Sequence, residues 1–231
     1  MKDVNSNSTN KQKVGIAAAN RIKPNMTVGI GTGSTVAFAI AELGRRIKEE
    51  KLQFSCCVTS YSSLVLCLQN NIQPMLIENF TELDISIDGA DEVDSNLNLI
   101  KGGGAAHARE KIVHALSNEF LCIVDPSKLV KKLGNFPVPI ELLPVALNLV
   151  KREVQKLGAL NIELRMSVRK DGPVITDNGN LVIDAHFEIN DALLLEKEIN
   201  SIPGVVANGI FATVRPTEVI VGDDSIRIIK R

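Results

Sequence analysis

The feature that most restricts the fold is the stretch FLCIV at residues 120–124, in which every position is apolar. A strand buried on both faces has this composition, and such strands are typical of parallel sheets that helices cover on either side. Helical and extended segments also alternate along the first 130 residues. The sequence therefore predicts a Rossmann-like three-layer α/β/α domain.

The elements of this domain follow from apolar spacing and from turn residues. Val36, Ile40 and Leu43 recur at helical spacing after Ser34, which we expect to cap that helix. Further helices are expected at residues 11–22 and 62–70 and around Glu110. Strands are expected at residues 26–31, 54–58, 74–77, 83–87 and 97–100.

The order of elements changes near residues 133–139. The spacing then predicts a second unit of strand 136–140, helix 144–157, strands 159–166 and 181–187, helix 191–201 and strand 205–212. This βαββαβ order is that of a smaller α+β ferredoxin-like domain. The two terminal strands, TEVIVG and SIRIIK, are expected to rejoin the first sheet. We thus expect a Rossmann-like catalytic domain at 1–132 plus 209–231 and a ferredoxin-like domain at 133–208.

Composition excludes several classes of function. The 26 Lys and Arg residues nearly balance the 27 Asp and Glu residues, so no basic field favours nucleic acid. No segment resembles a secretory signal or approaches eighteen apolar residues, so we expect a cytoplasmic protein with no membrane partner. The four cysteines form no CxxC pair, and the three histidines lack ligand spacing, so we expect buried thiols and neither metal nor cofactor.

The loop GIGTGST, residues 29–35, follows a predicted strand and opens a predicted helix. Backbone N–H groups at such a junction attract anions. The loop lacks the GK[ST] end of a Walker motif and has Val36 where a dinucleotide fingerprint needs a small residue. A small phosphate-bearing ligand fits better, and the alternative is an ordinary tight turn with a capped helix.

Residues 86–113 combine charge with backbone freedom. Asp88 ends a predicted strand, Asp91 follows in a turn, Lys101 ends another strand, and Gly102–Gly104 lead into the helix of Glu110. Taken singly, the aspartates could be turn formers, the lysine a solvated strand end, and the glutamate a partner of His114 four residues later. Taken together, they are expected to converge at the carboxyl edge of one sheet, where α/β proteins bind ligands.

These residues carry a resemblance to a known family. TGST (Thr32–Thr35), DGAD (Asp88–Asp91), KGGGAA with REK (Lys101–Lys111) and DPSK (Asp125–Lys128) resemble, in identity and order, the motifs of type A ribose-5-phosphate isomerase. The stretches LGNFPVPIE, VITDNGN and NSIPGVV continue the resemblance along nearly the whole chain. The chain departs from the family pattern at His107-Ala108 and at TSYSSL, residues 59–64, which includes Tyr61.

The resemblance implies a cofactor-free aldose–ketose isomerase of the non-oxidative pentose phosphate pathway, which interconverts ribose 5-phosphate and ribulose 5-phosphate. By that resemblance Glu110 is the base that moves a proton between C1 and C2 through an enediolate. Asp88 and Asp91 would bind hydroxyls and help to open the furanose ring, and Lys101 would balance charge on the carbonyl oxygen. The implied substrate-binding residues are Thr32, Gly33, Ser34, Thr35, Asp88, Gly89, Ala90, Asp91, Lys101, Gly102, Gly103, Gly104 and Lys128.

Other functions remain open from the sequence. Sugar-phosphate-sensing regulators, glucosamine-6-phosphate deaminases and CoA transferases share this architecture, so fold alone does not choose among them. A non-catalytic sugar-phosphate binder would keep the TGST loop without needing Glu110, and an isomerase of another phosphosugar would keep both. The ferredoxin-like unit is expected to leave one sheet face uncovered, which must be solvated or meet another subunit. Members of the family that the chain resembles are dimers or tetramers, so the resemblance implies a homodimer or homotetramer.

Overall fold

The computed structural model describes residues 4–223 and 225–231, which form two compact units. The first unit comprises residues 1–90, 109–128 and 216–231, and the second unit comprises residues 91–108 and 129–215. The chain therefore passes between the units four times, and each unit is described by itself below.

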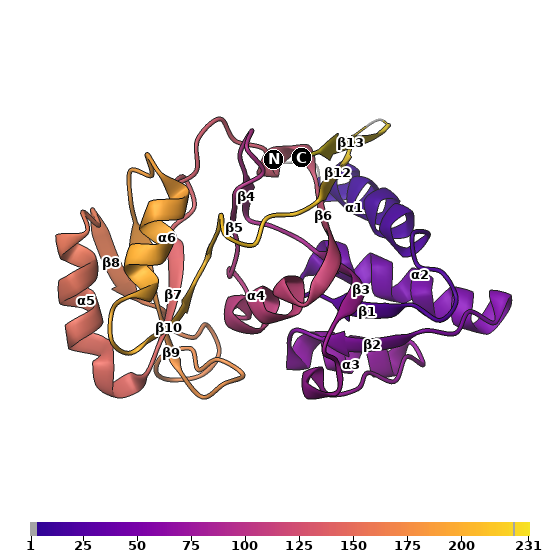
Figure 1. The fold of residues 1–231 in the computed structure, drawn as a ribbon, viewed down its shortest axis with the longest axis horizontal. Coiled ribbons are helices and arrows are strands. Elements are labelled where there is room, and N and C mark those ends of the chain that lie inside the picture. The colour runs from indigo at the N-terminus through magenta and orange to yellow at the C-terminus, as the bar shows by residue number, and fades with distance from the viewer. Residues whose placement is uncertain (1–3, 224) are drawn as a thin grey trace. The chain divides into compact units, whose positions relative to one another are not determined.

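The first unit is built on a six-stranded sheet (Figure 1). Its strands run in the order β13 (Ile226–Lys230), β12 (Glu218–Gly222), β6 (Ser117–Val124), β3 (Leu83–Asp88), β1 (Thr27–Ile30) and β2 (Ser55–Val58). All neighbouring pairs are parallel except β12 with β13. FLCIV lies in β6 between two parallel neighbours, which confirms the Rossmann-like fold and the return of the terminal strands to this sheet.

Helices cover both faces of that sheet. The helices of the unit are α1 (Val4–Ala19), α2 (Ser34–Glu50), α3 (Tyr61–Gln69) and α4 (His107–Ala115), whose first two residues belong to the second unit. The α1, α2 and α3 helices pack in one core with Cys56, whereas Val113 of α4 packs with Cys57 in another. Because successive strand residues point to opposite faces, these cores are the two sides of a three-layer sandwich.

The second unit contains the expected βαββαβ order. Its elements are β7 (Val138–Leu142), α5 (Leu147–Lys156), β8 (Asn161–Leu164), β9 (Leu181–His186), α6 (Ala192–Asn200) and β10 (Val205–Asn208). The four strands form an antiparallel sheet in the order β10-β7-β9-β8, and one core joins its buried residues to those of α5 and α6. This confirms the ferredoxin-like arrangement.

A small antiparallel sheet in the second unit was not expected. It joins β11 (Ile210–Phe211), β5 (Leu99–Ile100) and β4 (Glu92–Val93). The Glu92 carboxylate also accepts hydrogen bonds from the N–H groups of Gly134 and Phe136. Residues 91–108, 129–132 and 209–215 group with the second unit, whereas the predicted boundaries placed them in the first.

Three local expectations were wrong. Residues 74–77 form no strand, because Pro74 has no N–H for a ladder, and a short 3₁₀ turn, Ile77–Asn79, follows instead. The run 205–212 divides into β10 and β11, which belong to different sheets. Ser34 is the first residue of α2 and not its cap, since the N-cap is Gly33.

The expected open face of the ferredoxin-like sheet is partly covered. Glu141 of β7 is fully buried, and its Oε1 accepts hydrogen bonds from Thr176 Oγ1, Asn178 Nδ2 and Asn180 Nδ2. These donors lie in the turn before β9. The connection 165–180 therefore packs on the face that α5 and α6 leave bare.

Candidate active site

The loop after β1 lies at the point in the first sheet where strand order reverses. The chain runs from β1 outward to β2, and then returns to β3 on the other side of β1. Ligands of open α/β sheets bind at the carboxyl ends of the strands at such a point. Thr32–Thr35 extend from β1 into the N-terminus of α2, and Asp88 ends β3 beside them.

Hydroxyl groups fix the shape of this loop. Thr32 Oγ1 lies 2.8 Å from Thr59 Oγ1, 2.7 Å from Ser60 Oγ and 3.1 Å from Ser63 Oγ. These partners follow β2 at the same edge of the sheet. The TSYSSL segment thus supports the loop after β1, and Thr32 directs its own hydroxyl toward protein groups.

A positively charged side chain also lies at this loop. Lys11 of α1 donates a hydrogen bond from Nζ to Ser34 Oγ over 3.1 Å. Ser34 stands in the first turn of α2, where the helix dipole favours negative charge. The junction therefore presents backbone N–H groups, hydroxyls and one ammonium group, which is a suitable set for a phosphate.

Asp88 is fully buried at the end of β3. Its Oδ1 accepts hydrogen bonds from the N–H groups of Thr32 at 3.0 Å and of Gly89 at 2.7 Å. Its Oδ2 lies 3.0 Å from His114 Nε2. Both oxygens thus have protein partners, and the carboxylate ties the β1 loop, the start of the DGAD turn and α4 together.

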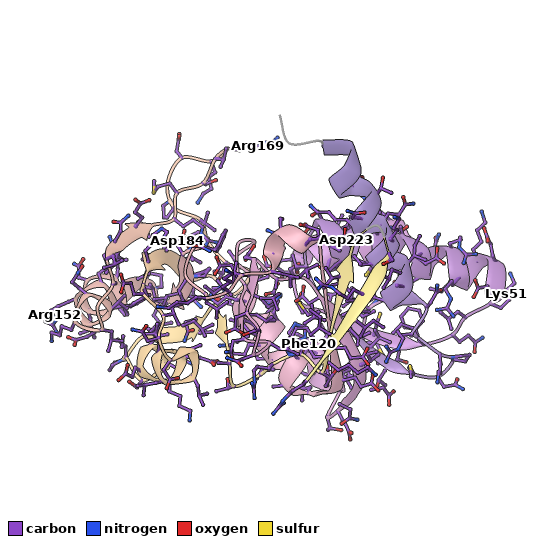
Figure 2. The ribbon with its side chains drawn as sticks, turned by 90° about the horizontal axis from the view of Figure 1, so that it is seen from above. Lys51, Phe120, Arg152, Arg169, Asp184 and Asp223 are labelled. Atoms are coloured by element: carbon purple, nitrogen blue, oxygen red, sulfur yellow. The ribbon has the colours of Figure 1, made fainter. Side chains whose placement is uncertain are left out.

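The buried imidazole of His114 contacts two side chains of β3. Its Nδ1 lies 2.9 Å from Ser86 Oγ, and its ring stacks on Phe120 of β6 at 3.8 Å between centroids and 8° between planes. Figure 2 labels Phe120 in this unit. Ser86 and Asp88 are two apart in one strand, so they share a face and both reach the same imidazole.

Glu110 lies in the first turn of α4 and is 4% exposed. The helix dipole favours a carboxylate at that position, whereas burial disfavours one that has no use or partner. The neighbouring Arg109 places its guanidinium 5.4 Å from the centroid of the Tyr61 ring. The prediction that Glu110 lies in apolar surroundings rather than in solvent is consistent with this burial.

The second unit holds the other predicted groups. Lys101 follows β5 and is 3% exposed, and its Nζ lies 5.6 Å from the centroid of the Phe211 ring. Gly103 donates its N–H to Asp91 Oδ2 over 2.9 Å. Gly102 has a φ of 103°, a conformation that favours glycine. Asp91 therefore anchors the glycine loop that follows Lys101.

The remaining predicted residues flank these groups. Lys128 ends a 3₁₀ turn, Pro126–Lys128, which follows the carboxyl end of β6. Asp125 fixes that turn by accepting a hydrogen bond from Ser127 N at 3.0 Å. Gly89 and Ala90 connect Asp88 to the point where the chain enters the second unit.

One expectation about the site was wrong. Lys101 does not end a strand of the same sheet as Asp88, because β5 belongs to the small antiparallel sheet of the second unit. Thr32–Thr35, Asp88, Glu110 and Lys128 belong to the first unit. Asp91, Lys101 and Gly102–Gly104 belong to the second unit. Their joint action on one ligand stays a prediction.

Sequence reasoning missed two residues of the first unit. Lys11 gave no signal, because its partner Ser34 is 23 residues away. His114 was considered only as a partner of Glu110, four residues earlier. The alternation of Ser86 and Asp88 in one strand could have indicated a shared buried partner, but not which residue supplies it.

Two negative findings apply to the described residues. In residues 4–223 and 225–231, no group of three or more His, Cys, Asp or Glu side chains is arranged to hold a metal ion. Within the same ranges, none of the helices combines the length and the apolarity that crossing a bilayer requires.

Comparison with known proteins identifies the family. The family model of ribose 5-phosphate isomerase A (phosphoriboisomerase A) matches residues 55–225. Ribose-5-phosphate isomerase A of Thermosynechococcus vestitus is 51% identical over 226 residues, which cover 95% of each chain. The solved ribose 5-phosphate isomerase A of Methanocaldococcus jannaschii superimposes with a TM-score of 0.94 at 46% identity, over 97% of this chain and all of that one.

A further solved relative carries a ligand. It is a D-ribose-5-phosphate isomerase in complex with phospho-erythronic acid, with a TM-score of 0.93 and 43% identity over 96% of this chain and 98% of that one. The matched motifs, the extent of the alignments and the shared fold agree with one another. This chain belongs to the ribose-5-phosphate isomerase A family.

Proposed function

We propose that this chain interconverts ribose 5-phosphate and ribulose 5-phosphate with Glu110 as the general base. Isomerase activity is the activity of its family. The single observation that supports the assignment of the base is the burial of the Glu110 carboxylate at the start of α4. A carboxylate in such surroundings is a competent acceptor for a carbon-bound proton, because little water competes for it.

The proton transfer is balanced without a cofactor. Glu110 takes the proton from C2 of the open-chain aldose, and the electron pair of that bond forms the C1–C2 double bond of an enediolate. The carbonyl oxygen at C1 becomes the negatively charged oxygen. Glu110 then returns the proton to C1, and the proton of the C2 hydroxyl passes to the C1 oxygen, which gives the ketose with its C2 carbonyl and C1 hydroxyl.

Lys101 and the glycine loop would stabilise the charged oxygen. An ammonium group and backbone N–H donors that are already oriented lower the free energy of an oxyanion more than water does. The low exposure of Lys101 supports this role, since a desolvated charge acts more strongly. Asp88 and Asp91 would contact sugar hydroxyls and assist ring opening, in addition to the loop contacts described above.

The phosphate would bind at the loop after β1. Gly33, Ser34 and Thr35 would supply N–H donors there, and Ser34 and Thr35 would add hydroxyls. Thr32 would shape the loop through its bonds to Asp88 and Thr59. Lys11 contributes an ammonium group through its contact with Ser34. Gly89, Ala90, Gly102, Gly103, Gly104 and Lys128 complete the proposed substrate-binding set.

The deciding experiment compares chelator-treated wild-type protein with Glu110→Gln. We expect wild type to convert ribose 5-phosphate, and the variant to lose about 10³-fold or more in kcat, because it cannot accept a proton. Proton NMR in deuterium oxide should show exchange at C2 with wild type alone. Glu198→Gln, the same change on the exposed side of α6, is the matched control and should retain full activity. Full turnover by Glu110→Gln would refute the proposed base.

The substrate is tested separately. The complex of a relative with phospho-erythronic acid supports a phosphosugar, since that ligand carries both a phosphate and a planar carboxylate resembling an enediolate. We expect kcat/KM for ribose 5-phosphate to exceed that for arabinose 5-phosphate. The reverse preference would assign the chain to another phosphosugar.

We further propose a cytoplasmic homodimer or homotetramer that acts in the non-oxidative pentose phosphate pathway. The large exposed apolar side chains of the second unit, such as Leu160 at 70% exposure, support association with another copy. Light scattering at micromolar concentration tests the oligomer. A species of 25.0 kDa, the mass of one chain, would count against it.

A further inference from the structure

Arg165 connects the ferredoxin-like sheet to the glycine loop of the same unit. It follows β8, and its guanidinium pairs with Asp184 of β9, with Nε donating to Oδ2 over 2.8 Å and Nη2 donating to Oδ1. The remaining nitrogen, Nη1, donates to the carbonyl oxygens of Gly102 at 2.8 Å and Gly103 at 3.3 Å. Figure 2 labels Asp184. The guanidinium therefore has one side on a carboxylate and the other on the loop.

These contacts fix the orientation of two peptide groups. The peptide bonds of the described residues are trans, so each carbonyl and the following N–H point in opposite directions. The Gly102 carbonyl faces Arg165, and the N–H of the same peptide, on Gly103, donates to Asp91. That peptide is therefore held at both ends. The Gly103 carbonyl also faces Arg165, so the N–H of Gly104 points away from the guanidinium.

Such restraint matters because glycine has the most freely rotating backbone. The Gly102 carbonyl also accepts a hydrogen bond from Ala105 N at 2.9 Å, so the restraint by Arg165 matters most for the peptide between Gly103 and Gly104. Without it, the N–H of Gly104 would point at a substrate oxygen only part of the time. Gly103 and Gly104 are exposed, so the loop is open to a ligand. Hydrogen bonds in series also polarise one another, so a guanidinium on a carbonyl strengthens the N–H at the other end of its peptide.

We propose that Arg165, held by Asp184, is a positioning residue for the isomerase reaction. It directs the N–H of Gly104, in the loop that follows Lys101, at the substrate oxygen that becomes negative in the enediolate. This inference rests on the proposed function. It assigns Arg165 no contact with the substrate, since the side chain acts through the loop peptides.

The test replaces the guanidinium in two ways. Arg165→Met removes the charge and all three donating nitrogens, and Arg165→Lys keeps the charge but lacks the planar fork that reaches Asp184 and the loop together. We expect kcat to fall by about 100-fold for Met, the size typical of a misplacement near 1 Å, and by at least about 10-fold for Lys. The KM for ribose 5-phosphate should change less than threefold. Arg152→Met, an arginine of α5 that is 65% exposed, is the matched control.

A second readout separates positioning from a structural role. Phospho-erythronic acid serves as the probe, because its planar anionic carboxylate resembles the enediolate. If Arg165 positions the loop, the inhibition constant of this acid should rise in step with the loss of kcat. If Arg165 only stabilises the fold, the active fraction falls but the inhibition constant stays at the wild-type value.

The outcomes are distinguishable from failure of the proposed function. Absence of turnover by wild type would remove the proposed function itself. With an active wild type and an inactive Glu110→Gln, unchanged kcat in both Arg165 variants would overturn the inference, and so would lower kcat with an unchanged inhibition constant. Should Arg165→Met fail to fold, Arg165→Lys and Asp184→Asn carry the test. We expect Asp184→Asn to lower kcat in wild type but to add nothing to Arg165→Lys.

Discussion

Substituting Gly31 by alanine tests the packing around Asp88. A Cβ on Gly31 would lie 2.2 Å from Asp88 Cγ, 2.3 Å from Oδ1 and 2.6 Å from Cβ. Normal contacts between such atoms exceed about 3.4 Å, so the two chain segments would have to separate by more than 1 Å. Gly31 N is itself bonded to the carbonyl oxygen of Ile87 at 2.9 Å, which opposes that separation.

The free-energy cost of Gly31→Ala can be calculated from these contacts. Overpacking of a close-packed interior costs about 1–3 kcal/mol. A shifted Asp88 would also weaken its bonds to the N–H groups of Thr32 and Gly89, and a hydrogen bond to a charged group contributes about 1.5–3 kcal/mol. Loss of one such bond brings the expected destabilisation of Gly31→Ala to about 3–5 kcal/mol, a large part of the stability of an ordinary domain.

Urea unfolding measures this change, and Gly89→Ala is the matched control for stability. A Cβ on Gly89 would meet only the carbonyl oxygen of Ile123 at 3.7 Å, so we expect a loss under about 1 kcal/mol. Gly31→Ala should unfold at a clearly lower urea concentration and should lose most of its kcat. If Gly31→Ala unfolds with the same midpoint as wild type, then the contact between the β1 loop and Asp88 is not as tight as the structure has it.

Three further predictions concern stability and reactivity. Burial raises the pKa of the Cys57 thiol to about 11 and of the Cys67 thiol to about 12, and all four cysteines are buried. A disulfide reagent at pH 8 should therefore label no cysteine until urea unfolds the chain. Labelling of the native protein would contradict the burial. Glu141→Gln keeps the acceptor oxygen used by the turn before β9 and replaces the buried Oε2, which has no hydrogen-bond partner in the described residues. The melting temperature of this variant should therefore equal or exceed that of wild type. A fall of several degrees would contradict this expectation. Hydrogen bonding to Arg21 lowers the pKa of Glu218 below its ordinary value. The pair therefore stabilises the fold above the ordinary carboxyl pKa, and this stabilisation is lost as pH falls through the lowered, folded-state pKa. Arg21→Met should therefore cost about 1 kcal/mol at pH 7 and nothing in acid, and a cost independent of pH would refute the assignment.

The large elements of the fold were predictable because they carry long patterns. FLCIV has only apolar side chains, and β6 places it between two parallel strands under helices on both faces. The helix and strand spacings of residues 138–208 gave the ferredoxin-like order in the same way. In each case several residues repeat one period, and burial enforces that period on the structure.

The small sheet of the second unit could not be predicted from such patterns. Its strands are two residues long, which is too short for any period to be visible. The apolar run 205–212 gave no sign of its division at Gly209, which is fixed by partners far away in the sequence. Gly209 N donates to the Pro139 carbonyl at 2.7 Å, and its own carbonyl accepts from Lys101 N at 2.9 Å. Only glycine fits there, because a Cβ would lie 2.2 Å from the Lys101 oxygen.

In the candidate site, too, some residues could be predicted from the sequence and others could not. Glu110, Asp88 and the glycine loops were identified because their residue types and order carry the chemistry. The groups that hold them were not, since His114 and Arg165 act through tertiary contacts that join separate elements. A pattern along the chain identifies reactive groups, whereas the support for those groups depends on which elements the fold brings together.

The chain crosses between the two units four times, and this limits how recombination can exchange parts of the gene. Neither unit is encoded by a continuous segment, so a single recombination event cannot exchange one unit for that of a relative without dividing both. Exchanging the second unit alone requires four joins. Three of them fall at or within two residues of Asp91, Glu110 and Lys128. Inheritance of the chain as one piece therefore preserves the proposed reacting groups in their native context.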